Sequence, residues 1–256
     1  MKNNDHNLIV RKSNDLIQKS RFSLSLQQQK ILLYIIGHIE PSDTDFHEYT
    51  FAIKDFCQAC DIDPQCGTLY KEIKKIIKDI ADKSLWITLE DGRETLVRWI
   101  EKATIEKGIV KVRLDDDMKP FLLHLTKNYT YYELVWTLHF KSKYSIRLYE
   151  LIKSIHYDEF KPYTRVYKLD ELRKLLDAEV YPIFYDFKVR ALEPAIDEIN
   201  KLADKKIEYR AIKSGKKVAY IEITVSSITN SLERFNRYAD LVKPKEKRKK
   251  DDTSFI

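Results

Sequence analysis

Apolar residues recur at intervals of three and four in several long stretches of the chain, the spacing of a helix with one buried face. These stretches are residues 23–39, 69–81, 144–155 and 185–202, with shorter helices predicted at 54–60 and 170–176. Between them, apolar and polar residues alternate as in half-buried strands, at residues 49–53, 86–89, 95–105, 109–114, 164–169, 207–212 and 218–225. The pattern therefore predicts an α+β protein.

The predicted elements come in the same order in both halves of the chain: helix, strand, helix, helix, strand, wing and strand. Three segments of the first half can be laid on the second, namely Ile53 on Leu169, Phe56 on Leu172 and residues 82–89 on residues 204–211. One repeated unit explains both patterns, and a winged helix-turn-helix has this order of elements. We therefore predict two tandem winged helix-turn-helix domains related by internal duplication.

The repeat also predicts the domain boundaries. We place an N-terminal winged-helix domain at residues 1–136, a C-terminal one at residues 137–242 and a basic, disordered tail at residues 243–256. The segment that joins the domains, about residues 119–137, contains no Gly/Ser-rich spacer. Because such spacers make flexible linkers, we expect the two domains to pack against each other.

Pro194 lies in the middle of the helix predicted at residues 185–202 (YDFKVRALEPAIDEINKL). Proline inside a helix removes a backbone hydrogen bond and costs about 3 kcal/mol. We predict one kinked helix, held by a buried stripe in its second part at Leu192, Ile196, Ile199 and Ala203. The alternative is a helix that begins at Pro194, which would leave Lys188 and Arg190 in a loop.

Positive charge is concentrated in the second half of the chain. Residues 1–136 hold 20 Lys and Arg against 21 Asp and Glu, whereas residues 137–256 hold 26 against 19. Such an excess favours a polyanionic partner, because phosphate neutralisation releases counterions. Part of the excess lies in the basic run at residues 243–250, which by itself is more typical of a solvated chain end.

Motifs for catalysis, metals and membranes are weak or missing in the sequence. The segment 213–217 (KSGKK) lacks the first glycine and the Ser/Thr of a phosphate-binding loop, and the six histidines form no H-x-H or H-E-x-x-H pair. No apolar run approaches the roughly 20 residues of a bilayer span, and the N-terminal residues lack the apolar core of a secretory signal. We expect a cytoplasmic protein that contacts no membrane, holds no metal or cofactor and is not an enzyme.

Two smaller motifs have plainer explanations than a ligand site. Cys57, Cys60 and Cys66 could bind zinc with His47 as fourth ligand, but we prefer buried free cysteines on a short helix facing the core. The carboxylates at residues 115–117 could bind a cation, but a turn between strand and helix is the preferred interpretation.

A DNA-binding surface remains as the expected functional site. In a winged helix the third helix enters the major groove and the wing reaches the backbone or minor groove. In the second domain this selects Tyr181, Tyr185, Lys188, Arg190 and Lys201 on or before the helix, and Lys213, Lys216 and Lys217 on the wing. In the first domain it selects Lys71, Lys74, Lys75 and Lys78, which are weaker candidates because that half is slightly acidic. The alternative for these residues is an ordinary solvated face.

Two segments carry a resemblance to a known family. Residues 140–152 (FKSKYSIRLYELI) and 187–200 (FKVRALEPAIDEIN), with the wing at 207–223 (IEYRAIKSGKKVAYIEI), resemble the plasmid replication initiator (Rep) proteins of the twin winged-helix, iteron-binding type. The start of the chain, residues 7–33, is also similar to the start of that family. The resemblance extends from about residue 7 to residue 226.

The resemblance implies a sequence-specific DNA-binding initiator. Such proteins bind directly repeated origin sites in double-stranded DNA, chiefly through the second winged helix, help to melt adjacent DNA and recruit the host replication initiator and helicase. Many form a homodimer through the first domain, and the dimer represses its own gene. By position, Lys188 and Arg190 correspond to the cationic start of the family's recognition helix, whereas Val189 departs from an arginine there.

Two other functions stay open at this point. A rolling-circle nicking enzyme would act through one of the 16 tyrosines, but no metal or cationic cluster that could stabilise the leaving phosphate can be identified. A plain transcriptional repressor would share the fold and the DNA contacts.

Overall fold

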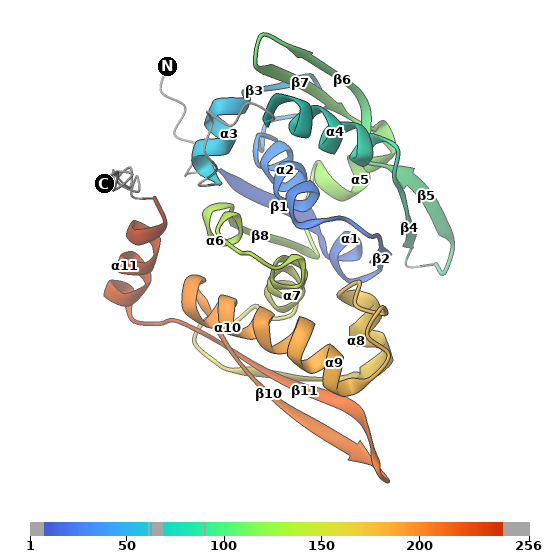
Figure 1. Cartoon of the computed structure of the whole chain (residues 1–256), viewed down its shortest axis with the longest axis vertical. Helices are drawn as coiled ribbons and strands as arrows, with labels where there is room; N and C mark the ends of the chain where they lie inside the picture. Colours follow the sequence, from blue (N-terminus) through green and yellow to red (C-terminus); the bar gives the residue numbers. More distant parts are fainter. Residues whose placement is uncertain (1–7, 61, 63–68, 90, 243–256) are drawn as a thin grey trace, which may run out of the picture.

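The computed structural model describes residues 8–60, 62, 69–89 and 91–242 (Figure 1). The first half forms, in chain order, β1 (Ile9–Ser13), α1 (Asn14–Gln18), β2 (Ser20–Arg21), α2 (Leu26–Gly37), β3 (Tyr49–Ala52), α3 (Ile53–Ala59), α4 (Leu69–Ala81), β4 (Ser84–Thr88), β5 (Glu94–Arg98), β6 (Ile100–Glu106), β7 (Ile109–Leu114), the 3-10 turn η2 (Asp116–Met118), α5 (Lys119–Leu122), β8 (Tyr129–Glu133) and α6 (Val135–Leu138).

The second half forms α7 (Lys143–Lys153), β9 (Tyr163–Lys168), α8 (Leu169–Leu175), α9 (Phe184–Phe187), the π-helical turn η3 (Lys188–Leu192), α10 (Glu193–Leu202), β10 (Lys205–Ser214), β11 (Lys217–Ser227) and α11 (Ser231–Val242). Every helix predicted from the apolar spacing is present, and the α+β class is confirmed. The basic tail at residues 243–256 lies outside the described residues.

Each half contains a three-stranded antiparallel sheet of the same topology. The strand order is β3–β7–β6 in the first half and β9–β11–β10 in the second. In both sheets the last strand is central, flanked by the strand before the short helix and by the first strand of the terminal hairpin. With α4 and α10 as third helices, these are two winged-helix units, as predicted.

Residues 95–105, predicted as one strand, form two strands in different sheets. β5 pairs with β4, whereas β6 pairs with β7. Trp99 between them is fully buried, with its ring edge-on to Phe22 at a centroid distance of 5.1 Å. Because Trp99 and Ile100 are both buried, the alternation breaks here and the chain passes from one sheet to the next.

The predicted match of residues 82–89 to residues 204–211 is corrected by the sheet topology. β4 follows α4 and β10 follows α10, but β4 belongs to the separate sheet β2–β4–β5, whereas β10 belongs to the winged sheet. The hairpin β4–β5 is thus an insertion between the third helix and the wing of the first unit. The other two matches agree with the structure. Ile53 and Leu169 are the first residues of α3 and α8, and Phe56 and Leu172, three residues later in these helices, are both buried.

The segment predicted as a link is folded and ties the two halves together. β8 pairs antiparallel with β1, and α7 then lies between the first unit and α10 (Figure 1). Lys12 of β1 forms a fully buried ion pair with Glu150 of α7 at 2.7 Å, and the Tyr132 hydroxyl donates to the same carboxylate at 2.7 Å. The expectation that the halves pack against each other is confirmed.

The last helix, α11, was not predicted and crosses the junction between the halves. The Arg237 guanidinium donates to the carbonyls of Asn200 and Ala203 at 2.7 and 2.9 Å, and Tyr238 packs edge-on against Trp136 of α6.

Of the helices in the described part of the chain, none is long and apolar enough to cross a membrane.

Candidate nucleic-acid interface

The helix that contains Pro194 is continuous, as predicted. α9, η3 and α10 follow one another without a gap, and the residues at both joints have right-handed helical angles. Its inner side is the predicted stripe of Leu192, Ile196, Ile199 and Ala203, all buried, and it packs on α7. Lys188 and Arg190 therefore lie on a helix and not in a loop.

A π-helical turn lets the helix pass Pro194. The Glu193 N–H donates to the Lys188 carbonyl, five residues back instead of four. A proline at 194 has no N–H for the Arg190 carbonyl, and its ring would clash with that carbonyl in a regular α-helix. Widening the turn gives the ring room, and it also changes the direction in which residues 188–192 point relative to α10.

Both cations of this turn are held by carboxylates of the same helix. Lys188 lies 3.4 Å from Glu193, which also accepts a 2.8 Å hydrogen bond from the Tyr209 hydroxyl of β10. Arg190 lies 3.6 Å from Asp186, one helical turn earlier, and its side chain remains 65% exposed. These pairs limit the rotamers of two long side chains that still reach solvent.

The other predicted residues of this helix are in three different environments. Tyr185 is 69% exposed on the outer side of α9. Tyr181 is partly buried, with its ring 6.2 Å from that of Tyr144, so most of its surface serves packing. Lys201 is exposed but lies eleven residues beyond Arg190, about 16 Å along the axis, at the end next to α11. The structure therefore brings Tyr185, Lys188 and Arg190 together and leaves Lys201 apart.

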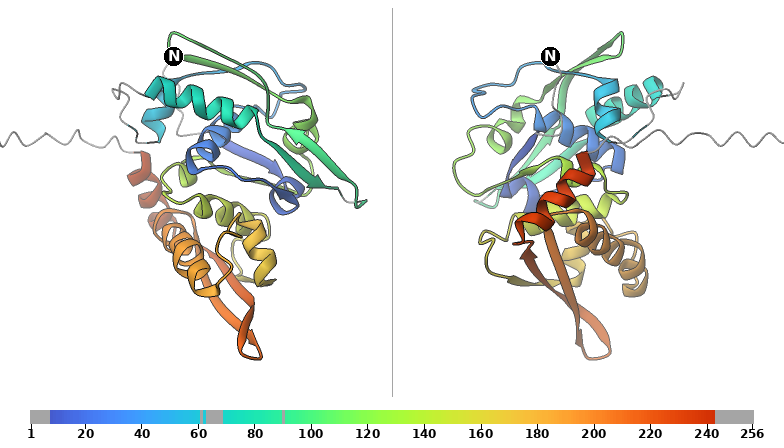
Figure 2. Two further views of the ribbon diagram at one scale, coloured as in Figure 1. Left: turned by 45° about the vertical axis from the view of Figure 1, so that its right-hand side comes forward. Right: turned by 90° about the vertical axis from the view of Figure 1, so that its left-hand side faces the viewer.

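The wing of the second unit is a long hairpin of β10 and β11 that projects from the body of the molecule (Figures 1 and 2). Gly215 turns the chain at the tip of this hairpin with a φ of +63°, a backbone conformation that residues with a side chain rarely adopt. The register shifts between Ile212 and Lys213. The predicted residues Lys213, Lys216 and Lys217 are all exposed at this tip.

The first unit presents its predicted lysines on α4. Leu69, Ile73, Ile77 and Ile80 form the buried stripe, while Lys71, Lys74, Lys75 and Lys78 are exposed on the remaining faces. Lys78 pairs with Asp82 at the end of the helix. This surface has no counterpart of the π turn.

Family models match most of the chain. A model described as "Initiator Replication protein, WH1" matches residues 9–153, and one described as "Initiator Rep protein, WH2" matches residues 168–225. The chain belongs to the initiator Rep protein family. A crystal structure of the Pi initiator protein in complex with iteron DNA is similar in fold, with a TM-score of 0.71 and 19% identity over 88% of this chain and 99% of that one.

Membership in the Rep family confirms the resemblance read from residues 140–152 and 187–200. The first segment covers most of α7, and the second covers Phe187, η3 and most of α10. Because α7 and α10 pack against each other, the resemblance rests on two helices in contact.

The cysteines of this Rep protein are buried where they are described. Cys57 and Cys60 face the core on and directly after α3, as predicted. Burial raises the pKa of the Cys57 thiol to about 11 and that of Cys60 to about 12, which keeps both in the thiol form. Cys66, the third member of the alternative zinc set, lies outside the described residues.

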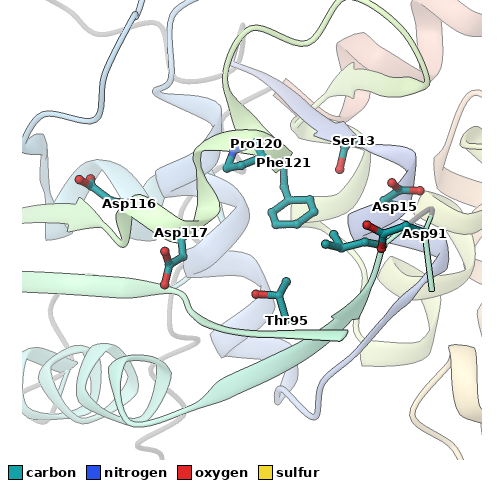
Figure 3. Close-up of a pocket in the computed structure, with 9 residues that line it drawn as sticks. Ser13, Asp15, Asp91, Thr95, Asp116, Asp117, Pro120 and Phe121 are labelled. Carbon is teal, nitrogen blue, oxygen red and sulfur yellow. The ribbon is translucent and has the colours of Figure 1, made fainter. Parts of the chain in front are cut away.

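A hollow with four aspartates in its lining lies on the first unit of the Rep protein. It has a volume of about 710 Å³ and is lined by Asp15, Asp91, Asp116 and Asp117 around Thr95 and Phe121 (Figure 3). Asp115 caps the turn η2 with its carboxylate, and Asp91 accepts the Arg93 N–H, so these acids serve as turn residues. Asp15, Asp91 and Asp116 also each pair with a nearby Lys or Arg, so three of the four carboxylates are neutralised within the protein.

Sequence reasoning missed the apolar part of the surface around the cations. Val180, Ile183 and Val189 are 71%, 62% and 42% exposed beside Tyr185. The sequence contained one indication of this surface, because all three residues lie outside the apolar stripe that packs on α7.

Proposed function

We propose that this Rep protein initiates plasmid replication by binding directly repeated origin sites in double-stranded DNA, chiefly through its second winged-helix unit. The observation that carries the proposal is the combination of Lys188 and Arg190 on the outer turn of the third helix with a projecting wing tipped by Lys213, Lys216 and Lys217. The family membership and the fold shared with the Pi initiator, which was solved on iteron DNA, support it.

The two groups of cations are suited to different tasks. A guanidinium can donate two hydrogen bonds to one guanine in the major groove, so Arg190 is proposed to read sequence. The wing lysines are point charges on a flexible hairpin and are proposed to hold phosphates. Lys71, Lys74, Lys75 and Lys78 on α4 are proposed to give auxiliary contacts.

The finer roles are also proposals. Bound at several repeats, the protein would help to melt adjacent DNA and recruit the host replication initiator and helicase, and a homodimer formed through the first unit would repress its gene. It would do so without cutting DNA. Incubation with supercoiled origin plasmid and Mg²⁺ or Mn²⁺ tests the last point, since a covalent protein–DNA product would contradict it.

The main proposal predicts direct repeats in the DNA that flanks the gene, and binding to a duplex of one such repeat tests it. The wild type should bind a repeat duplex far more tightly than a scrambled one. Arg190→Ala should reduce that discrimination by about 1–3 kcal/mol, whereas Lys216→Ala should weaken both duplexes alike and lower the salt slope by about one.

Lys206→Ala is the matched control, because Lys206 lies at the other end of β10, beside Glu233 of α11. It should change neither quantity. If Arg190→Ala and Lys216→Ala leave binding unchanged at low salt, the second unit is not the reader and the proposal fails.

A further inference from the structure

Four apolar side chains are exposed within ten residues, two before the third helix of the second unit and two on its first turns. This strip consists of Val180, Ile183, Tyr185 and Val189, with exposed fractions of 71%, 62%, 69% and 42%. Single exposed apolar residues are normal on protein surfaces. Four in one short stretch that also supplies Phe187 and Leu192 to the core are more than packing requires.

The described part of the first unit's third helix, α4, is less apolar on its outer face. On α4 the residues outside the buried stripe are mostly Lys, Glu and Asp, and its exposed large apolar residue is Tyr70 in the first turn. The two exposed apolar residues on the second unit's third helix, Tyr185 and Val189, therefore lie on a part of it that extends beyond the described length of α4.

Tyr185 and Val189 form the part of the strip that shares a face of the helix. They are four residues apart, and the Asp186–Arg190 pair, with the same spacing, shows that side chains so spaced meet across this turn. Arg190 and Lys188 flank Val189 directly in the chain. Each of these cations also lies near a carboxylate of the same helix, Glu193 for Lys188 and Asp186 for Arg190. DNA is favoured as the partner because Val189 lies on the helix that the proposed function places in the major groove.

Base pairs offer one apolar group in the major groove, the 5-methyl group of thymine. We propose that Val189, with Tyr185 beside it, contacts the 5-methyl group of a thymine next to the base read by Arg190. The inference rests on the proposed function and adds a specificity determinant to it.

Removal of single methyl groups from bound DNA tests this contact. The full chain selects duplexes from a random-sequence pool, and the enriched duplex is resynthesised with each thymine replaced in turn by uracil, which lacks only the methyl group. At one or two positions the wild type should lose about threefold to tenfold in affinity. Val189→Ser should bind the thymine and uracil duplexes equally at those positions.

Val166→Ser is the matched control, because Val166 is 49% exposed on β9, away from the helix. It should keep the full response to uracil. An enriched duplex with no methyl-sensitive thymine, or a Val189→Ser protein as sensitive as the wild type, overturns the inference and leaves the proposed function standing. Failure to enrich any sequence overturns both. A change of oligomeric state in Val189→Ser, without a change in methyl sensitivity, would assign the strip to a protein contact and overturn the inference.

Discussion

The two winged-helix units place an aspartate just after the third helix, in opposite environments. Asp82 after α4 is more than half exposed and pairs with Lys78. Asp204 after α10 is 1% exposed, accepts the Tyr149 hydroxyl at 2.8 Å and lies 3.2 Å from Lys153 of α7. The third helix of the second unit, α10, is thus anchored by a buried charge network. The third helix of the first unit, α4, is followed by an inserted hairpin and an exposed surface.

The two wings differ in the same sense. Three of the four basic residues of the β6–β7 hairpin lie near acids: Lys102 lies 3.4 Å from Glu48, Lys107 lies 3.9 Å from Glu106, and Arg113 pairs with Glu101. On β10–β11, Lys213, Lys216 and Lys217 have no carboxylate within 4.0 Å among the described residues. Charges already neutralised within the protein have less to gain from phosphate. The tip of the second wing therefore carries positive charge that no nearby carboxylate neutralises within the described residues, as the proposed function requires.

Removal of the buried aspartate should have the largest effect. Asp204→Asn leaves the mostly buried Lys153 without its ion-pair partner, also removes a partner of Arg234, and should lower the free energy of unfolding by about 3–5 kcal/mol. Asp82→Asn removes an exposed partner and should leave the midpoint of urea unfolding almost unchanged. Denaturation of both variants measures the contrast. Equal losses would mean that the two positions are not as different as their burial indicates.

Sequence pattern predicted most of the fold because most elements bury one apolar face. The stripes of α4 and α10 and the hairpin around Gly215 follow directly from spacing and turn chemistry. β1 and β8 escaped prediction because their inner faces carry Lys12, Thr130 and Tyr132, whose polar groups are satisfied only by distant partners such as Glu150. The spacing of apolar residues indicates which positions are buried, but it does not indicate which buried charged residues form ion pairs.

The candidate site was predictable in outline and not in detail. The place of Lys188 and Arg190 followed from the winged-helix order, but the π turn depends on how Pro194 and the buried Phe187 and Leu192 are accommodated together. A five-residue step between these two buried side chains is compatible with a π turn. Because Ala191 is buried as well, the same pattern also fits a regular helix, and only the backbone decides.

The contrast between the wings should appear as salt dependence. Replacing Lys213, Lys216 and Lys217 together by Ala should reduce the slope of log affinity against log salt by up to about three, or roughly several hundredfold in affinity at 0.1 M salt. The matched triple of Lys102, Lys107 and Lys111 on the first wing should change the slope by less than about one. Titrations of repeat DNA at several salt concentrations test both. A larger change for the first wing would reverse the assignment.

The first helices of the two units are capped in different ways. In α2 the cap is local: the Ser25 hydroxyl accepts the Gln28 N–H, and the Gln28 side chain accepts the Ser25 N–H at 3.0 Å. In α7 the N-cap N–H is accepted by a residue of another helix, Glu198 of α10. Its carboxylate accepts the Lys141 N–H at 2.8 Å and the Ser142 N–H at 3.2 Å. The cap of α7 therefore also holds the third helix.

Substitution of each capping side chain should separate these roles. Glu198→Ala should cost about 1.5–3 kcal/mol of stability, because it removes hydrogen bonds to a charged group, whereas Gln28→Ala should cost about 1 kcal/mol. Glu198→Ala should also weaken DNA binding by loosening α10, and Gln28→Ala should not. Urea unfolding and repeat-DNA titration report the two effects. DNA binding that is unaffected in both variants would show that the cap does not position the reading helix.

The smallest expected contrast concerns pH and the junction beside Asp204. The His156 Nε2 lies 2.8 Å from the Lys161 carbonyl and its Nδ1 lies 3.1 Å from the Lys205 ammonium, so the neutral ring donates to the carbonyl and accepts from the lysine. Burial lowers the pKa of His156, and the nearby Lys205 and Lys153 lower it further, against the opposing effect of the hydrogen bond to Lys161. Below a pH of about 6.5 the unfolded chain therefore binds a proton that the folded chain does not, and stability should fall as pH falls through that window.

Glutamine can keep both hydrogen bonds without titrating, so His156→Gln should flatten the dependence of the unfolding free energy on pH between pH 7.5 and 5.5. The exposed His47→Gln in the first unit should retain the wild-type slope, and a His156→Gln protein with that same slope would show that the junction of the second unit does not sense pH in this range.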